Sequence, residues 1–291
     1  MAKKTKDWPI PSIFFRTAYN LVDLGVGRHF RPASFISPAS QLTHYCADAS
    51  WTRHQEILRI CPSLVKAYIN VHPASVEWRT PSGEAIDLPH LRCVYISHIE
   101  PLEYLRMPHL HQATLDFSTL SDCTISPAVQ YFLTNSSHNV QRLGLRGLRG
   151  GAVAKEILRS HSRLTELVIM MNFHEVDAHD VSCALIDVLN VNTAEDTVVL
   201  PGLSCIHIAF EAASLTLLDN DLYIKMLEYR WKMQPRVLEA ATLCFECGPW
   251  PESNARLEAL CCDGLDFTLA EVGNVLEFMA YEWLCRPKWM M

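Results

Sequence analysis

A hydrophobic pattern recurs along this chain: a leucine-like residue, two other residues, an apolar residue, one other residue and a second apolar residue. The starts of its copies are 19 to 39 residues apart, about 28 on average. This spacing is close to the roughly 20–29-residue period of leucine-rich repeats. The alternation within each copy predicts a short strand. The copies begin at Leu64, Leu91, Leu110, Val140, Leu164, Leu203, Leu238 and Leu257.

Before the first copy and between several later ones, apolar residues recur three or four positions apart, which predicts one buried face of a helix. Asn220 and Asp221 are suitable caps for the last of these helices. Prolines two residues before several copies would end the preceding element. The predicted helices cover residues 52–60, 126–135, 151–160, 179–190 and 221–232. Strands alternating with helices predict an α/β fold, namely a leucine-rich-repeat solenoid shaped as an irregular horseshoe. Its parallel strands would line the concave side and its helices the convex side.

The pattern divides the chain into three expected parts. Residues 1–50 lack it and contain a Pro/Ser-rich stretch, so we expect an N-terminal arm or irregular cap without a clear F-box. Residues 51–263 form the repeats. Residues 264–285 have the spacing of a final helix, which would cover the last strand edge. We therefore expect residues 264–291 to be a C-terminal capping helix and tail.

Composition narrows the classes of partner. The formal net charge is −7 and no large cationic cluster is evident, which disfavours nucleic acid and anionic membranes. No apolar stretch approaches the roughly 20 residues of a membrane span. The segment Trp8–Phe15 is too short and interrupted to predict a signal peptide. We expect an intracellular protein, cytoplasmic or nuclear, whose eleven scattered cysteines are reduced thiols that pack as small hydrophobic groups. A disulfide framework is the alternative.

Three groups of residues could carry metal or acid–base chemistry. Cys244, Cys247, Cys261 and Cys262 could supply sulfur ligands to zinc, although core positions on neighbouring strands would also bring them together. The segment His174–Asp180, with His174, Asp177 and His179, could bind a metal or act as an acid–base pair. A solvated loop leading into a helix explains it equally. His109 and His111 on one face of a strand could also coordinate a metal, but no third ligand is evident.

Motifs of known enzymes are missing from the sequence. The segment Gly147–Gly151 superficially resembles a phosphate loop, but it lacks the Gly-Lys-Ser/Thr ending, so a strand-to-helix turn is favoured. There is also no nucleophile elbow, zinc-protease helix or kinase signature. We therefore expect no enzyme activity, no cofactor and no bound metal.

Residues that alternate with the core positions would face the concave side of the predicted sheet. They are polar and aromatic in the early copies, charged in the central copies and nearly apolar in the late ones. Tyrosine and arginine are frequent anchors of protein interfaces. We expect Tyr68, Tyr95, Arg142 and Arg146 to contact a protein partner. A merely solvated inner face is the alternative.

Several short segments give the chain a family likeness: Ile57–Leu64, Leu88–Leu91, Met107–Leu110, Met226–Trp231 and Leu257–Phe267. In this order they resemble the leucine-rich-repeat region of F-box-type proteins, especially those of mushroom-forming fungi (basidiomycetes), over about residues 50–270. The resemblance implies that the repeats capture a substrate and that an F-box recruits the adaptor of a cullin–RING ubiquitin ligase. An F-box opens with Leu-Pro-x-Glu, whereas the segment Trp8–Leu21 lacks the acidic residue and is too short for three helices before Pro32.

The expected function is therefore a non-catalytic protein–protein interaction module. The resemblance implies a substrate-recognition subunit of a cullin–RING ubiquitin ligase. One alternative is a repeat scaffold, or a truncated F-box relative, with no ligase link. A more distant alternative is a metal-dependent enzyme built on His174, Asp177 and His179.

Overall fold

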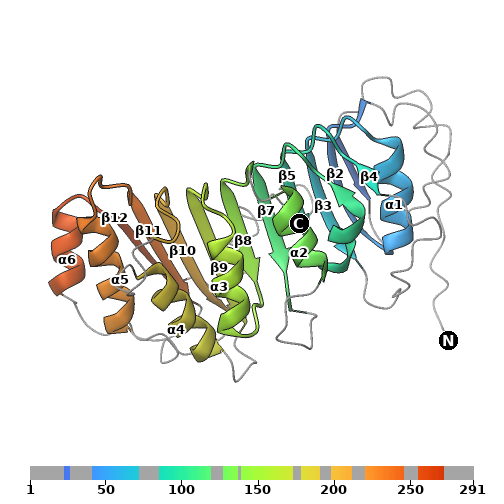
Figure 1. Cartoon of the computed structure of the whole chain (residues 1–291). Coiled ribbons are helices and arrows are strands. Elements are labelled where there is room, and N and C mark those ends of the chain that lie inside the picture. The colour runs from blue at the N-terminus through green and yellow to red at the C-terminus, as the bar shows by residue number, and fades with distance from the viewer. Residues whose placement is uncertain are drawn as a thin grey trace, which may run out of the picture.

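A ten-stranded parallel sheet dominates the computed structural model. The structure describes residues 23–26, 41–71, 85–118, 127–136, 139–172, 178–190, 198–211, 220–245 and 255–271. The strands lie side by side in chain order (Figure 1). They are β1 (Asp23–Val26), β2 (His44–Ala49), β3 (Lys66–Val71), β5 (Cys93–Ile96), β7 (Gln112–Asp116), β8 (Arg142–Arg146), β9 (Glu166–Asn172), β10 (Cys205–Glu211), β11 (Ala240–Phe245) and β12 (Asp266–Glu271).

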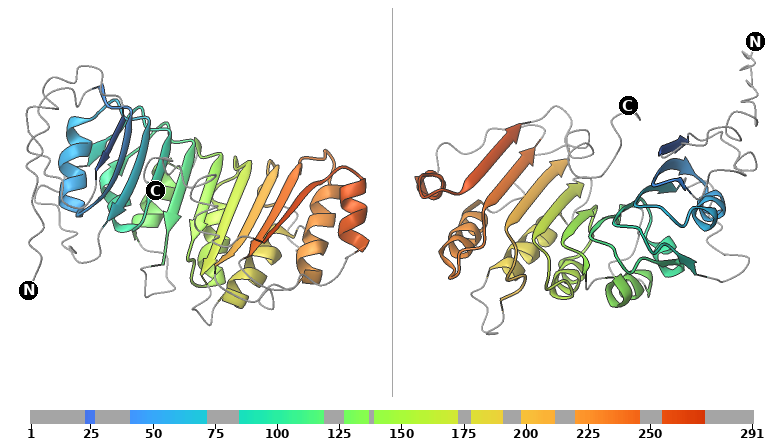
Figure 2. Two further views of the ribbon diagram at one scale, coloured as in Figure 1. Left: turned by 180° about the vertical axis from the view of Figure 1, so that it is seen from behind. Right: turned by 90° about the horizontal axis from the view of Figure 1, so that it is seen from above.

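The helices of the described chain cover one face of this sheet. The sheet is bent, and these helices lie on the outside of the bend (Figure 2). A small second sheet pairs β4 (Ile86–Asp87) with β6 (Leu105–Arg106), and a 3-10 helix, η4 (Glu100–Tyr104), lies between those two strands in the chain. The helices are α1 (Trp51–Ile60), α2 (Pro127–Ser136), α3 (Gly151–Arg159), α4 (Ala178–Leu189), α5 (Asn220–Lys232) and α6 (Ala255–Cys262).

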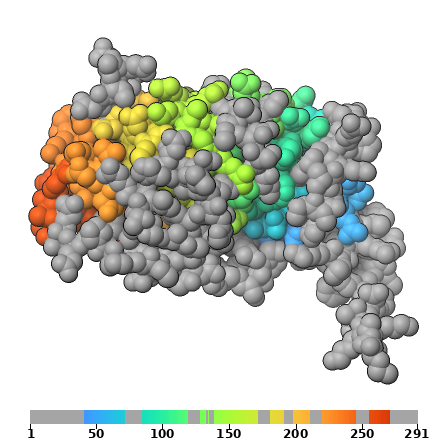
Figure 3. Space-filling view, turned by 90° about the horizontal axis from the view of Figure 1, so that it is seen from below, coloured from blue at the N-terminus to red at the C-terminus, as the bar shows by residue number. Residues whose placement is uncertain are grey.

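The prediction of an α/β fold with a parallel sheet is confirmed. Each of the first seven copies of the hydrophobic pattern contains a strand of the large sheet, and the five predicted helices correspond to α1 to α5. The space-filling view shows the same progression on the surface, from the early units at one end to the late units at the other (Figure 3). The units are therefore arranged along the length of the molecule in the order in which they occur in the sequence.

A repeated hydrogen-bond arrangement holds the strands in register. The N–H groups of Val65 and Lys66 both donate to the carbonyl of Thr43, and those of Arg92 and Cys93 both donate to the carbonyl of Val65. The same pairing of two donors with one carbonyl continues unit by unit as far as Glu239. Because the side-chain period of a strand is two, this constant register keeps each apolar position on the same face in every unit.

The main hydrophobic core lies between the sheet and the helices. The first position of the pattern is buried in every unit from Leu64 to Leu238, at 0–2% exposure. The fourth and sixth positions are also buried, as with Ala67 and Ile69 in β3. Full burial of one such leucine stabilises the fold by about 1.5–3 kcal/mol. Each unit shares this core with its neighbours.

The prediction of a strand in the eighth copy is wrong. The segment from Leu257 to Cys262 is part of the helix α6, with Leu257 and Leu260 buried and Cys261 and Cys262 exposed. Apolar residues three positions apart fit a helix as well as they fit the first part of the strand pattern. The strand of this unit is β12, whose residues fall within the helix predicted over residues 264–285.

The expected boundaries at both ends also need correction. Residues 266–271 form a strand paired in parallel with β11, so the predicted helix over residues 264–285 is wrong in this part. Residues 272–291 lie outside the described chain. In the expected N-terminal arm, β1 and β2 extend the large sheet beyond β3. Leu42, Tyr45 and Ala47 occupy the first, fourth and sixth positions of the pattern and are buried.

Candidate functional site

The side chains on the helix-free face of the sheet, here called the inner face, form three rows across the strands. The first row is accessible, because each of its members is partly or fully exposed. The second row is buried from Tyr95 in β5 to His207 in β10. In the third row, Met170, Ala209 and Cys244 are buried. The first row consists of His44, Lys66, Cys93, Gln112, Arg142, Glu166, Cys205, Ala240 and Asp266.

A cluster centred on Asp116 connects the second and third rows. The rings of Tyr68 and Tyr95 stack with centroids 4.3 Å apart and an interplanar angle of 8°. The Tyr95 hydroxyl donates to Asp116 Oδ2 at 3.3 Å, and Arg146 Nη1 donates to the same oxygen at 2.8 Å. The other oxygen of Asp116 accepts the Ser118 N–H at 2.9 Å. Both carboxylate oxygens are thus engaged within the protein.

Burial sets the protonation of Tyr95 within this cluster. It raises the pKa of the Tyr95 hydroxyl well above its usual value, and the Asp116 carboxylate raises it further. The hydroxyl therefore stays protonated and remains a donor to Asp116 at physiological pH. Tyr95 is 3% exposed, so its ring acts mainly by packing against Tyr68 and orienting Asp116.

A second polar cluster joins the central strands. Arg142 Nε lies 2.9 Å from Glu166 Oε1, and both side chains are about one-quarter exposed, at 26% and 24%. His207 Nε2 lies 3.9 Å from the same Glu166 oxygen. Burial, together with the charge of Arg142, lowers the pKa of His207 to about 3, so this imidazole is neutral at physiological pH. Burial raises the pKa of Glu166, and Arg142 opposes that shift.

The structure brings the four predicted contact residues onto the inner face, in two groups. Tyr68, Tyr95 and Arg146 belong to the Asp116 cluster, whereas Arg142 lies in the accessible first row with Glu166. Sequence reasoning did not single out Asp116 or Glu166, although both alternate with core positions. The signal that could have identified them is a carboxylate in register with an arginine of a neighbouring strand, since Asp116 pairs with Arg146 and Glu166 pairs with Arg142.

The proposed cysteine ligands do not come together. Cys244 is buried on the inner face in β11, while Cys261 and Cys262 are exposed on α6, which packs on the other face. Cys247 lies outside the described residues. Within the described chain, no group of three or more His, Cys, Asp or Glu side chains is arranged to hold a metal ion.

The histidine candidates differ from the sequence interpretation. His109 lies in a turn and His111 precedes β7, and both are exposed, so they do not share a strand face. His174 and Asp177 lie outside the described residues, and His179 falls within α4.

None of the helices in the described part of the chain has the length and apolar character of a membrane span.

The glycine segment after β8 is the expected strand-to-helix turn into α3. Gly147 has φ +61°, and its N–H donates to the carbonyl of Met170 at 2.9 Å. A β-carbon there would clash with the Ser118 side chain and would lie 2.8 Å from the Ser118 Cα and N atoms. At this turn, Ser118, which follows β7, therefore packs directly against Gly147, which follows β8.

We expect Gly147→Ala to lower the free energy of unfolding by about 2 kcal/mol, because it combines a left-handed backbone with this clash. Gly202→Ala is the matched control, since the nearest atom to its β-carbon would be the Leu164 carbonyl oxygen at 3.8 Å. Urea unfolding followed by circular dichroism measures both. Equal stability of the two variants would contradict the assignment of Gly147.

Comparison with known proteins does not assign the chain to a family. No family model matches it, and no curated protein matches it. A crystal structure of a protein from Bacteroides fragilis is similar over 90% of this chain and 69% of that chain, with 11% sequence identity and a TM-score of 0.46. Similarity at this level identifies neither a family nor a function.

Proposed function

We propose that the chain is a non-catalytic protein-interaction module, built as a leucine-rich-repeat solenoid with an irregular horseshoe shape. The observation that carries the proposal is the accessible first row of the inner face, which presents one side chain per strand at constant register. Neighbouring strands are about 4.8 Å apart, so five successive positions span roughly 20 Å. An extended row of this kind suits a protein surface better than a small substrate.

The central part of the first row presents polar and charged side chains that could form hydrogen bonds and ion pairs with a partner. Lys66, Gln112, Arg142 and Glu166 offer positive, amide and negative groups on the strands β3, β7, β8 and β9. The Asp116 cluster lies beside them and is held by internal hydrogen bonds. A rigid aromatic and ionic support lowers the entropy lost when first-row side chains are ordered by a partner. Arg142 is the proposed anchor because its guanidinium is oriented by Glu166 and remains partly exposed.

The more specific proposal concerns the class of partner. The resemblance of residues 50–270 to the repeat region of F-box-type proteins supports a substrate receptor of a cullin–RING ubiquitin ligase. A repeat scaffold without a ligase link is the alternative, because residues 8–21 depart from the F-box pattern. Co-purification of the ligase adaptor with the tagged full-length chain would support the receptor. Capture of a partner without the adaptor would support the scaffold.

We expect Arg142→Glu to reduce partner capture at least tenfold. The substitution places two carboxylates together at the centre of the first row, and a tenfold change corresponds to about 1.4 kcal/mol of binding free energy. Affinity capture followed by quantitative mass spectrometry measures the recovery of each partner relative to wild type. The matched control is Arg159→Glu, which makes the same charge change at an exposed position of α3.

Two outcomes would overturn this site. Unchanged recovery with Arg142→Glu would remove the first row from the interface. Equal loss with Arg159→Glu would show that net charge, rather than the inner face, governs capture. Circular dichroism of both variants confirms that each retains its fold.

A further inference from the structure

The outer layer of the protein is interrupted where two units follow each other closely. Leu91 and Leu110, which begin successive copies of the pattern, are 19 residues apart. This length leaves no room for an α-helix of the kind found in other units, and the segment instead forms η4 and β6. On this side of the molecule, α1 packs against β4 and α2 packs against η4.

The two strands of this small sheet lead into equivalent turns. Asp87 pairs with Arg106 in the parallel register of β4 and β6, and the Leu88 N–H donates to the Arg106 carbonyl at 2.9 Å. Each strand is followed by a buried apolar residue, Leu88 or Met107, and then by an exposed proline, Pro89 or Pro108. The same side-chain types thus occur twice, one unit apart.

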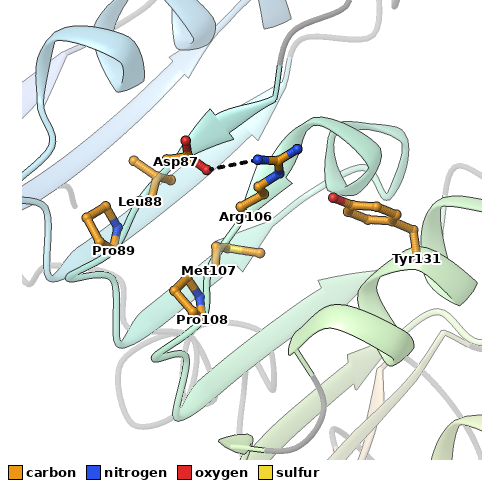
Figure 4. A pocket seen from close by; sticks show the side chains of 7 residues that line it. All are labelled: Asp87, Leu88, Pro89, Arg106, Met107, Pro108 and Tyr131. Atoms are coloured by element: carbon orange, nitrogen blue, oxygen red, sulfur yellow. Dashed lines mark ion pairs between the residues drawn. The ribbon is translucent and has the colours of Figure 1, made fainter.

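A pocket of about 350 Å³ lies between these turns and α2 (Figure 4). Its base is apolar, because Leu88 and Met107 are buried there. The aromatic ring of Tyr131, from α2, stands across from the Met107 side chain (Figure 4). The volume lies at the lower end of the range for small ligand sites and suits one large side chain. The lining residues are Asp87, Leu88, Pro89, Arg106, Met107, Pro108 and Tyr131.

At the rim of the pocket, Asp87 and Arg106 present an acceptor group and a donor group. Arg106 Nη1 lies 3.7 Å from Asp87 Oδ1, and the two side chains are 61% and 70% exposed. An ion pair this exposed contributes little to stability, so both groups can turn toward a ligand at small energetic cost. A carboxylate only accepts hydrogen bonds and a guanidinium only donates them. Together they complement a peptide, which has one N–H donor and one carbonyl acceptor per residue.

We propose that this pocket binds a large apolar side chain, preferably aromatic, from an extended peptide segment of a partner. The side chain enters between Met107, Pro108 and Tyr131, where thioether, proline and aromatic surfaces all pack well against a ring. The flanking peptide N–H donates to Asp87, and the flanking carbonyl accepts from Arg106. This site is separate from the inner face and does not depend on the function proposed for it.

The test uses N-acetyl-L-tryptophanamide as the probe, titrated into the ¹⁵N-labelled full-length chain and followed by NMR. We expect saturable shifts confined to residues 86–90, 105–109 and the neighbourhood of Tyr131, with a Kd on the order of 1 mM, as for a single side chain. N-acetylglycinamide, which has the peptide groups without the ring, should cause at least tenfold smaller shifts. Indole, which has the ring without the peptide groups, should bind at least fivefold more weakly.

Variants separate the two parts of the site. Tyr131→Ala and Arg106→Gln should each weaken binding of the probe at least fivefold. Tyr229→Ala is the matched control, since it removes an exposed tyrosine from α5 and should leave the affinity unchanged. Shifts centred elsewhere, or an affinity unaffected by Arg106→Gln and Tyr131→Ala, would overturn the proposal. Binding of indole as tight as that of the amide would exclude the peptide contacts with Asp87 and Arg106.

Discussion

Replacing Arg230 with methionine is expected to lower the free energy of unfolding by about 4 kcal/mol. Arg230 lies on α5 and is 3% exposed. Its guanidinium donates to the carbonyls of Leu189 at 2.8 Å, Leu200 at 3.0 Å and Val199 at 2.6 Å. Methionine fills most of the space but leaves these three acceptors without their donor.

The three carbonyls explain why a charged group is stable at this depth. Leu189 is the last residue of α4, where unsatisfied carbonyls carry partial negative charge. Leu200 has φ +56°, and the carbonyls of Val199 and Leu200 at this turn both point toward Arg230 on α5. Burial lowers the pKa of Arg230 to about 10, and the side chain therefore remains protonated at physiological pH. Arg230 links the end of one unit to the helix of the next.

Two further variants define the role of Arg230. Arg230→Lys keeps the charge but loses the planar fork, so it should lose less stability than Arg230→Met but remain below wild type. Lys225→Met is the matched control on the same helix, because Lys225 is exposed and its solvent-exposed pair with Asp221 contributes little to stability. Urea unfolding measures the three variants. An effect of Arg230→Met no larger than that of Lys225→Met would contradict the structural role.

The sequence predicted the periodic part of the fold well because one physical constraint repeats in every unit. Each strand must bury its fourth and sixth positions against the same core, and each helix must bury a stripe. These requirements determined α1 to α5 and the strands of seven copies. They did not identify Arg230, although Tyr223, Met226, Leu227 and Arg230 share one helical face. A charge on an apolar face is ordinarily exposed, and the carbonyls that hold it come from a different unit.

The ends of the array were predicted less well. At β12 the first position of the pattern is Gly264, whose φ is +105°, so the leucine that marks other units is missing there. The neighbouring helix α6 supplied a more conspicuous pattern at Leu257. At β2 the pattern is present, but with Tyr45 and Ala47 instead of branched aliphatic residues. Short patterns of this kind cannot separate strands from helices without the register of the neighbouring strand.

The sequence pattern predicted which face of the sheet the candidate residues occupy, but not how exposed each side chain is. Alternation correctly placed Tyr68, Tyr95, Arg142 and Arg146 on the inner face, since strand side chains alternate between faces. Alternation contains no information about depth along that face. Tyr95 is buried, whereas Lys66 and Gln112 of the first row are accessible. The pairing of Asp116 with Arg146 joins residues 30 positions apart and becomes evident only once the strands are in register.

Acidification from pH 6.5 to pH 4 is expected to destabilise the protein by about 3 kcal/mol through His54 alone. His54 on α1 is fully buried. Its Nε2 donates to the carbonyl of Asn70 at 3.1 Å, which leaves Nδ1 to accept the Tyr45 hydroxyl at 2.8 Å. This neutral tautomer satisfies both ring nitrogens. Burial lowers the pKa of His54 to about 4, and the hydrogen bond to Asn70 only partly opposes that shift.

The sign of the effect follows from the two pKa values. In the unfolded chain the His54 pKa is near 6.5, and in the folded chain it is about 4. Between these values the unfolded state binds more protons, so stability falls as the pH falls through this window and is unaffected above it. His207, whose pKa is lowered to about 3, acts in the same direction. Both histidines therefore oppose folding in acid.

His54→Gln removes this titration while keeping a donor for Asn70 and an acceptor for Tyr45. We expect the variant to lose some stability at pH 7, because glutamine packs less well than imidazole, but to show a shallower decline between pH 6.5 and pH 4. His90→Gln, at an exposed turn position, is the control and should follow the wild-type profile. Urea unfolding at half-unit pH intervals gives the slopes. A His54→Gln slope equal to that of wild type would show that His54 does not govern acid stability, and the decline would then have to come from other groups such as His207.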